Sequence, residues 1–94
     1  MTSEPLVTVL MPAYNSASFI GAAIVSILAQ TFTGFELLVI DDGSTDGTVE
    51  VVRGYAKNDP RIRLIVRDHL GLVDTLNFGL RQAQGSYLAR LDAD

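Results

Sequence analysis

Two groups of acidic residues are the part of this sequence best suited to chemistry. Asp41 and Asp42 are adjacent in the middle of the 94-residue chain, and Asp92 and Asp94 are separated by one residue at its end. Side chains two residues apart in an extended segment point to the same side, so Asp92 and Asp94 can share a divalent cation and the phosphate oxygens that it bridges. Asp is also a common turn residue at strand ends, and this simpler interpretation of the pair stays open.

The segment Asp-Asp-Gly-Ser at 41–44 also has two interpretations. It is typical of a turn in which an Asp side chain accepts backbone hydrogen bonds before a helix begins. Such a turn needs one acidic residue, whereas the sequence has two. The second carboxylate is then expected to be unpaired at a cleft, where it can accept a hydrogen bond from the N–H of a base or from ribose hydroxyls.

Several other side chains have both a functional and a structural interpretation. Tyr14 can stack on a base or cover the core. Arg63, Arg67 and Arg90 can neutralise phosphate, although arginine beside a sheet is more often solvated or ion-paired. His69 is the one histidine of the chain. Because neither a second histidine nor a cysteine accompanies it, we expect a loop residue there, not a metal ligand or a general base.

Charge and composition exclude several classes of protein. Lys and Arg number 7 against 11 Asp and Glu, and the formal net charge is -4, so we expect no nucleic-acid binding. The absence of cysteine excludes disulfides, zinc-thiolate sites and thiol nucleophiles. The first five residues lack the pattern of a signal peptide, and no apolar run approaches the roughly 18 residues of a membrane span. We therefore expect a cytoplasmic protein.

Apolar runs and helical stripes alternate along the chain and must position these groups. The runs at 6–11, 35–40, 62–66 and 87–91 predict buried strands, the first of them ended by Pro12. Apolar residues at helical spacing predict three helices: one near 20–30 with possible caps at 15–18, one capped by Ser44 or Thr45, and one from Gly71 to Ala83. Gly85 occupies the position of a left-handed residue that ends the third helix.

Strands that alternate with helices predict an α/β fold built from parallel βαβ units with right-handed crossovers. Ligands of such sheets bind beyond the carboxyl ends of the strands. The polar groups at 12–15, 41–44 and 92–94 all follow predicted strands. We therefore expect them to converge at one edge of the sheet.

Five ordered segments together resemble one known family. They are VLMPAYN at 9–15, SILAQTF at 26–32, FELLVIDDGSTDGT at 35–48, LNFGL at 76–80 and AQGSYLARLDAD at 83–94. The set is similar to the N-terminal half of the family 2 glycosyltransferases and covers nearly the whole chain from Leu6 onward. The resemblance implies an enzyme of the GT-A fold, in which this part is a Rossmann-like three-layer sandwich of four parallel strands, in the order 3-2-1-4, with three helices.

The resemblance also implies roles in binding a nucleotide-sugar, expected to be a UDP-, GDP- or TDP-sugar. Asp42, with Asp41 beside it, is expected to hold the edge of the nucleobase. The residues expected to line the base and the ribose are Pro12, Ala13, Tyr14 and Asn15.

The end of the chain matches the Asp-x-Asp motif of the family. By this resemblance Asp92 binds the ribose, and Asp92 and Asp94, chiefly Asp94, bind a Mn²⁺ or Mg²⁺ ion on the diphosphate. Asn77 is expected to orient the loop and helix near the phosphates. Asp74 departs from the family, whose members often have alanine or lysine there, so a cationic phosphate contact from that turn is not expected.

Members of the family place their general base and acceptor site after the Asp-x-Asp motif, and no residue follows it here. We therefore expect residues 1–94 to form a single partial domain that has no catalytic residue, binds the donor weakly and transfers no sugar. The parent protein is expected to transfer a sugar to an acceptor hydroxyl with help from the cation, in cell-wall or polysaccharide biosynthesis. Any membrane contact, at the inner face, is expected through parts outside this chain.

A partial sheet also predicts an exposed strand edge at 87–91. Backbone groups at such an edge can pair with another copy of the chain. We therefore expect self-association through Tyr87–Leu91.

Two other classes compete with a transferase. A non-catalytic nucleotide-binding module such as a receiver domain has acids after the first strand that pair with a later acid and a lysine, whereas here the first strand ends in Pro-Ala-Tyr-Asn and the only lysine, Lys57, is expected in the second helix. A dinucleotide-dependent oxidoreductase requires Gly-x-Gly-x-x-Gly after a strand, which this sequence lacks. An inert, self-associating fragment is the remaining alternative.

Overall fold

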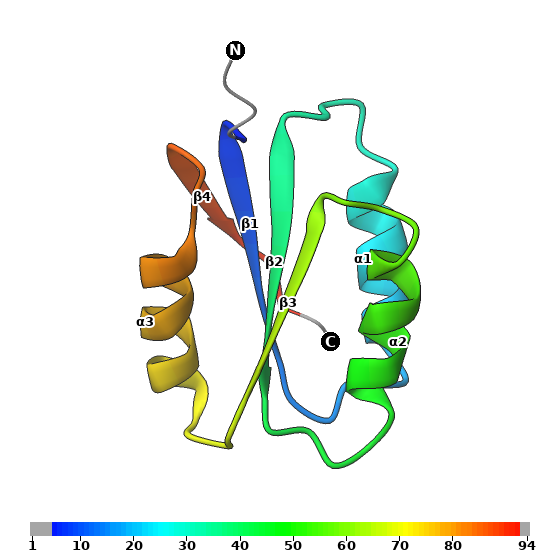
Figure 1. Ribbon diagram of the computed structural model, residues 1–94, viewed down its shortest axis with the longest axis vertical. Helices are drawn as coiled ribbons and strands as arrows, with labels where there is room; N and C mark the ends of the chain where they lie inside the picture. Colours follow the sequence, from blue (N-terminus) through cyan, green and yellow to red (C-terminus); the bar gives the residue numbers. More distant parts are fainter. Residues whose placement is uncertain (1–4, 93–94) are drawn as a thin grey trace.

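The computed structural model describes residues 5–92, which form a parallel sheet between two layers of helices (Figure 1). The strands lie in the order β3-β2-β1-β4, and each pairs with its neighbours in parallel. The predicted α/β class and strand order are confirmed. The elements in chain order are β1 (Val7–Ala13), α1 (Ile20–Leu28), β2 (Phe35–Asp42), α2 (Thr48–Ala56), β3 (Ile62–Arg67), α3 (Leu72–Gln82) and β4 (Tyr87–Arg90).

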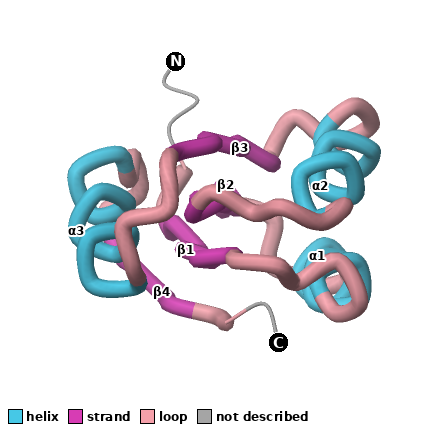
Figure 2. The backbone as a smooth tube through the Cα atoms, turned by 90° about the horizontal axis from the view of Figure 1, so that it is seen from below, coloured by secondary structure: helices cyan, strands magenta, loops and turns pink. Residues whose placement is uncertain are grey.

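The helices divide between the two faces of the sheet. Helices α1 and α2 cover one face and α3 covers the other, as Figure 2 shows from below the view of Figure 1. The chain builds β1, β2 and β3 outward in one direction and then returns through α3 to place β4 on the other side of β1. Ligands of open α/β sheets bind beyond the carboxyl ends of the strands at such a reversal.

Strand β2 forms the centre of the core, and all of its residues are buried. Its side chains alternate between two clusters because successive side chains of a strand point to opposite faces. Leu37 and Val39 belong to the cluster on the α1 and α2 face. Leu38 and Ile40 belong to the smaller cluster that Leu76 and Phe78 of α3 cover. Burial on both faces explains the continuous apolar run in the sequence.

Strand β1 passes through Pro12 and ends at Ala13, so the prediction that Pro12 ends the strand is wrong. The carbonyls of Leu6 and Leu10 accept hydrogen bonds from the Tyr87 and Leu91 N–H groups on the β4 side. Along β1, the backbone N–H and C=O groups of every second residue point toward β4. Pro12 is two residues after Leu10, so its nitrogen is on the β4 side as well. The pairing of β1 with β4 runs only from Val7 to Leu10, so the missing N–H of Pro12 breaks no hydrogen bond of the sheet.

The side-chain caps predicted for the first two helices are not found. Before α1, the N–H groups of Phe19 and Ile20 donate to the backbone carbonyl of Ser16 instead. Helix α2 begins only at Thr48, after Gly47, because Ser44 and Thr45 hydrogen-bond with Asn15 in the loop after β1 and Ser44 also with Asp41 near the end of β2. The Asp46 carboxylate accepts a hydrogen bond from the Thr48 N–H at 3.0 Å, which satisfies one of the free donors at the start of α2.

The prediction of a left-handed Gly85 is also wrong. Among the described residues, the glycines with positive φ are Gly43 and Gly71. Gly85 lies against β1, where an added Cβ would be 2.5 Å from the backbone nitrogen of Thr8. Gly85 is therefore needed for a close approach between the turn before β4 and β1, not for its backbone conformation.

A buried ionic cluster joins this turn to the sheet. The Glu36 carboxylate accepts hydrogen bonds from the Thr8 hydroxyl at 2.6 Å, the Gln84 N–H at 2.7 Å and Arg63 at 2.7 Å. The Thr8 hydroxyl in turn accepts one from the Gly85 N–H at 2.9 Å. Burial alone would raise the pKa of Glu36, but its hydrogen-bond donors and the charge of Arg63 hold that pKa below the usual value. One carboxylate of β2 thus links β1, β3 and the turn before β4.

Strand β4 is the most exposed element of the sheet. All of its residues are exposed, and Tyr87 is 66% and Leu88 43% accessible to solvent. Within the described part of the chain, β4 pairs with β1 on one side and with no strand on the other. Within residues 5–92, no helix has the length and apolar character needed to cross a bilayer.

Candidate functional site

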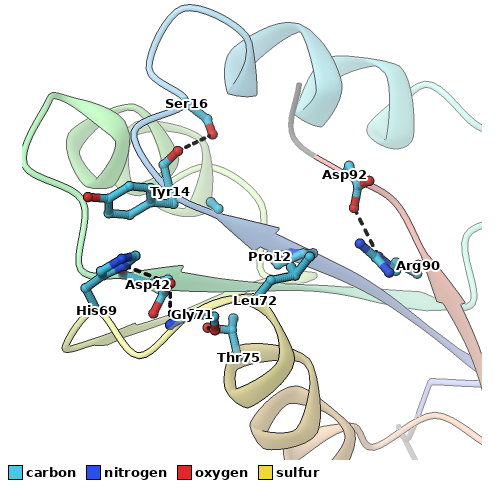
Figure 3. A pocket seen from close by; sticks show the side chains of 11 residues that line it. Pro12, Tyr14, Ser16, Asp42, His69, Gly71, Leu72, Thr75, Arg90 and Asp92 are labelled. Carbon is cyan, nitrogen blue, oxygen red and sulfur yellow. Dashed lines mark hydrogen bonds and ion pairs between the residues drawn. The ribbon is translucent and has the colours of Figure 1, made fainter.

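A pocket of about 310 Å³ opens where the carboxyl ends of β1 and β2 meet the loop before α3 and the end of β4 (Figure 3). The structure brings five of the predicted site residues to its wall: Pro12, Ala13, Tyr14, Asp42 and Asp92. The remaining lining residues are Ser16, His69, Gly71, Leu72, Thr75 and Arg90. The strand ends therefore converge around one pocket, at the reversal between β1 and β4.

Asp42 is buried and fully engaged by the loop before α3. Its Oδ1 accepts a hydrogen bond from the Leu70 N–H at 2.7 Å, and its Oδ2 accepts one from the Gly71 N–H at 3.1 Å. His69 Nδ1 lies 2.9 Å from Oδ2. The expectation of an unpaired carboxylate at this position is therefore wrong, because backbone and imidazole donors already surround it.

These donors also determine the charge of Asp42. Burial alone would raise the pKa of its carboxyl, but the N–H groups of Leu70 and Gly71, the Thr75 hydroxyl and the nearby His69 hold that pKa below the usual value. Asp42 is consequently ionised at neutral pH. An ionised carboxylate only accepts hydrogen bonds, so Asp42 offers the pocket an acceptor and no donor.

Tyr14 and His69 form an aromatic pair at the same end of the pocket. Their ring centroids are 4.2 Å apart and their planes differ by 23°, so the rings are stacked. Tyr14 remains 46% exposed. His69 lies in a loop, as expected, but its ring lines the pocket, which the sequence did not indicate.

Asn15 and Asp41 shape the pocket without lining it. The Asp41 carboxylate accepts hydrogen bonds from the N–H and the hydroxyl of Ser44. Asn15 has a φ of 47°, in the left-handed region that Asn tolerates better than most residues. Its N–H donates to the Ser44 hydroxyl at 2.9 Å, and its Oδ1 accepts from the Thr45 N–H at 2.8 Å. These bonds tie the loop after β1 to the loop after β2 and so hold Tyr14 in place.

Arg90 and Asp92 lie at the opposite end of the pocket. Arg90 Nε donates to Asp92 Oδ1 at 3.1 Å, and the two side chains are 45% and 55% exposed. Both charges are therefore accessible to a ligand. Figure 3 shows this pair on the far side of Pro12 and Leu72 from Tyr14 and His69.

The Asp92 carboxylate can serve as a ligand of Mg²⁺ or Mn²⁺, since these ions bind carboxylate oxygens together with phosphate oxygens and water. Asp94, the other predicted metal ligand, lies outside the described residues. Within residues 5–92, no three acidic or histidine side chains gather as a metal site would require. Within the described residues, Asp92 can therefore offer a cation one carboxylate ligand.

The structure does not bring Asn77 to the pocket, since this residue is exposed on α3 and is not among the lining residues. Thr75, one turn into α3, is buried there, and its hydroxyl donates to the Gly71 carbonyl at 2.8 Å. Sequence reasoning missed Thr75. The available signal was its spacing: a residue four positions after Gly71 lies on the same side of the first helical turn as Gly71, and hence toward the pocket.

Comparison with known sequences finds a match over most of the chain. The family described as Glycosyl transferase family 2 matches residues 8–94. An uncharacterised glycosyltransferase of Haemophilus influenzae is 43% identical over 95 residues, which cover 100% of this chain and 29% of the relative. The chondroitin synthase of Escherichia coli is 38% identical over 90 residues, covering 96% of this chain and 13% of that protein.

Solved structures share the fold. The mannosyltransferase PcManGT from Pyrobaculum calidifontis, in complex with GDP-Man and Mn²⁺, has a TM-score of 0.88 and 35% identity, covering 97% of this chain and 28% of that one. TarS 1-349 of S. aureus, in complex with UDP-GlcNAc, has a TM-score of 0.87 and 30% identity, covering 94% of this chain and 26% of that one. In all four comparisons, this chain spans less than a third of the other protein.

Proposed function

Because this chain belongs to the family 2 glycosyltransferases, we propose that its pocket is the donor site of an enzyme that transfers a sugar from a nucleoside diphosphate to an acceptor hydroxyl. One observation carries the proposal. The pocket has an aromatic ring and a buried acceptor, Tyr14 and Asp42, at one end and two exposed charges, Arg90 and Asp92, at the other. A nucleoside diphosphate has the matching sequence of groups: a flat base, a ribose and a charged diphosphate.

The base end suits a particular class of nucleobase. Tyr14 offers a ring on which a base can stack, and the ionised Asp42 can only accept a hydrogen bond. Uracil, thymine and guanine carry a ring N–H on the edge that normally pairs, whereas cytosine and adenine have an unprotonated ring nitrogen there. We therefore propose a UDP-, TDP- or GDP-sugar as the donor. The GDP-Man and UDP-GlcNAc complexes of the two similar structures agree with this class.

At the charged end, Arg90 and Asp92 are proposed to contact the diphosphate and the ribose. The Arg90 guanidinium can donate two hydrogen bonds to phosphate oxygens. Asp92, with Asp94, is proposed to hold a Mn²⁺ or Mg²⁺ ion, and the Mn²⁺ in the PcManGT complex supports a divalent cation. Such a cation supplies positive charge beside the leaving diphosphate.

In the proposed reaction the bond between the anomeric carbon and the diphosphate oxygen breaks, and a bond from that carbon to the acceptor oxygen forms. The acceptor proton passes to a general base, and the electron pair of the broken bond leaves with the diphosphate. Residues 1–94 are proposed to be one partial domain that binds the donor. The acceptor site and the general base are proposed to lie on other parts of a longer protein, since this chain spans only 29% of a relative that it matches over its full length.

We also propose that isolated copies of this chain associate through β4. Its outer edge has no partner strand within the described residues, and an apolar groove of about 430 Å³ lies beside it on the α1 face. Residues that line the groove include Val9, Ile27, Phe35, Ala89 and Leu91. A second copy can pair edge to edge with β4 and cover this apolar surface.

Calorimetric titration tests the donor-site proposal. The purified chain is titrated with UDP, GDP and TDP, each with and without Mn²⁺, and CDP and ADP serve as matched controls. We expect one of the first three nucleotides to bind, more tightly with Mn²⁺, and the two controls to bind more weakly. Equal binding of all five contradicts the assignment of Asp42 to the base. Absence of binding favours the alternative of an inert, self-associating fragment.

A further inference from the structure

The imidazole of His69 already makes the two contacts proposed for the nucleobase. It is a flat nitrogen heterocycle stacked on Tyr14, with a centroid distance of 4.2 Å. Its Nδ1 lies 2.9 Å from Oδ2 of Asp42. Nδ1 also lies 3.0 Å from the backbone carbonyl oxygen of Asp42, to which it hydrogen-bonds. Because carbonyl and carboxylate oxygens can only accept, Nδ1–H is the donor beside these two oxygens, where the ring N–H of a uracil or guanine would donate. Figure 3 shows His69 beside Asp42, with Tyr14 above them.

The space between these groups does not admit a base as well. A centroid distance of 4.2 Å is that of two rings in direct contact, so no third ring fits between Tyr14 and His69. The Asp42 side chain is only 7% exposed, its Oδ2 already accepts from the Gly71 N–H, and Nδ1 of His69 lies 2.9 Å from the same oxygen. A base can stack on this face of Tyr14 and donate to Oδ2 only after the imidazole has moved away.

The structure allows the side chain of His69 to leave while its loop stays in place. The loop is held by its backbone: Asp42 accepts from the N–H groups of Leu70 and Gly71. On the other side, the His69 backbone packs so closely on Gly43 that an added Cβ would be 2.5 Å from the His69 nitrogen. The His69 side chain itself is 55% exposed, so it can rotate into solvent without breaking these backbone contacts.

We propose that His69 occupies the nucleobase position when no donor is bound, and that the base of the donor displaces it. The inference rests on the proposed donor site. The imidazole then acts as a built-in competitor, because donor binding must first free Tyr14 and Oδ2 of Asp42. The apparent affinity is lowered by the fraction of molecules in which the position is filled. It also keeps the buried Asp42 carboxylate paired in the unliganded chain, where an unpaired charge is unfavourable.

Substitutions at His69 test this inference. The affinities of the variants and of the unsubstituted chain for uridine, guanosine and the corresponding diphosphates are compared by calorimetry or by NMR titration. His69→Ala removes the competitor, and we expect it to bind the preferred nucleoside about tenfold more tightly than the unsubstituted chain. His69→Phe keeps a ring for stacking but has no N–H for Asp42, and its affinity is expected to lie between the two. Asp68→Ala, an exposed neighbour in the same loop, is the control and is expected to match the unsubstituted chain.

NMR of the unsubstituted chain gives a second measurement. The ring protons of His69 are expected to be shifted by the Tyr14 ring current in the free chain and to lose this shift when the nucleoside is added. If His69→Ala binds no more tightly, or more weakly, His69 does not compete with the base, and the inference fails while the donor site stands. If neither protein binds any of the nucleotides, the donor-site proposal itself fails, and the inference fails with it.

Discussion

The substitution Glu36→Gln tests whether the buried ionic cluster positions β4 and, with it, Arg90 and Asp92. Glu36 is 5% exposed and accepts hydrogen bonds from Thr8, Gln84 and Arg63. The amide of Gln has the same shape as the carboxylate but only one oxygen. Because that oxygen can replace Oε2, Thr8 and Gln84 keep a neutral acceptor, while Arg63 meets an NH₂ group that cannot accept.

The expected loss follows from these contacts. Two hydrogen bonds change from a charged to a neutral acceptor, at roughly 0.5–1 kcal/mol each. The third hydrogen bond, from Arg63, is lost. Because the Arg63 side chain is 32% exposed, water can hydrogen-bond to it instead, and the loss costs about 1 kcal/mol. We therefore expect the free energy of unfolding to fall by about 2–3 kcal/mol, which corresponds to roughly 10–20 °C in Tm for a domain of this size.

The effect should depend on pH in a defined direction. Despite its burial, the hydrogen bonds to Glu36 and the charge of Arg63 hold its pKa in the folded chain below the usual value of a glutamate. A lowered pKa stabilises the folded chain at pH values above the unfolded pKa, and this contribution is lost as the pH falls through the folded pKa. Gln at this position cannot titrate. The difference between the two proteins should therefore be largest near neutral pH and should shrink below about pH 4.

Urea denaturation of both proteins at about pH 7 and about pH 3.5 measures this difference. Glu50→Gln makes the same chemical change on the exposed surface of α2, and its effect is expected to stay within about 0.5 kcal/mol. Two results would refute the reasoning: a Glu36→Gln midpoint equal to that of the Glu50→Gln control, or a Glu36→Gln difference that does not change in acid.

Three further predictions concern the turn before β4, the cation and the outer edge of β4. Gly85→Ala should lower the free energy of unfolding by about 2–4 kcal/mol, because its Cβ would lie 2.5 Å from the Thr8 nitrogen. Urea midpoints measure this against Gly54→Ala, whose Cβ would meet nothing within 4 Å, and equal midpoints would contradict it. Asp92→Asn should remove most of the Mn²⁺ enhancement of UDP binding in calorimetry and weaken uridine binding less, through the ribose contact alone, and an undiminished Mn²⁺ effect would count against Asp92 as a ligand. Leu91→Asp should shift the chain toward the monomer in sedimentation velocity, whereas a chain that is monomeric at all concentrations without the substitution would overturn self-association.

The parallel direction of the strands and the edge that carries the pocket could be predicted because both depend on local patterns, whereas the strand order followed from the family resemblance. Continuous apolar runs such as 35–40 identify strands buried on both faces, and alternation with helices requires parallel strands whose carboxyl ends meet. The predicted strand ends were less accurate. Strand β2 continues through Asp41 and Asp42, whose polar side chains hid the last two residues of the strand.

The contacts of the pocket could not be predicted, since they join residues far apart in the chain. Nothing in the local sequence indicates that the Asp42 carboxylate binds the N–H groups of Leu70 and Gly71. The same is true of His69, whose position depends on the packing of its loop against Gly43. Gly85 was misinterpreted for a related reason: a glycine after a helix is usually explained by its own φ, whereas here it is explained by the distance to Thr8.

The two ends of the pocket differ in how firmly this chain holds them. At the base end, Tyr14 lies in the loop after β1, and hydrogen bonds of Asn15 with Ser44 and Thr45 hold this loop in place. The N–H groups of the loop before α3 hold Asp42. At the other end, Arg90 and Asp92 lie on and just after β4, whose residues are all exposed. Side chains that touch a ligand contribute most when their positions are fixed beforehand. In the proposed donor site, base recognition would therefore depend on contacts within the described residues, whereas binding of the diphosphate would depend on what packs against β4.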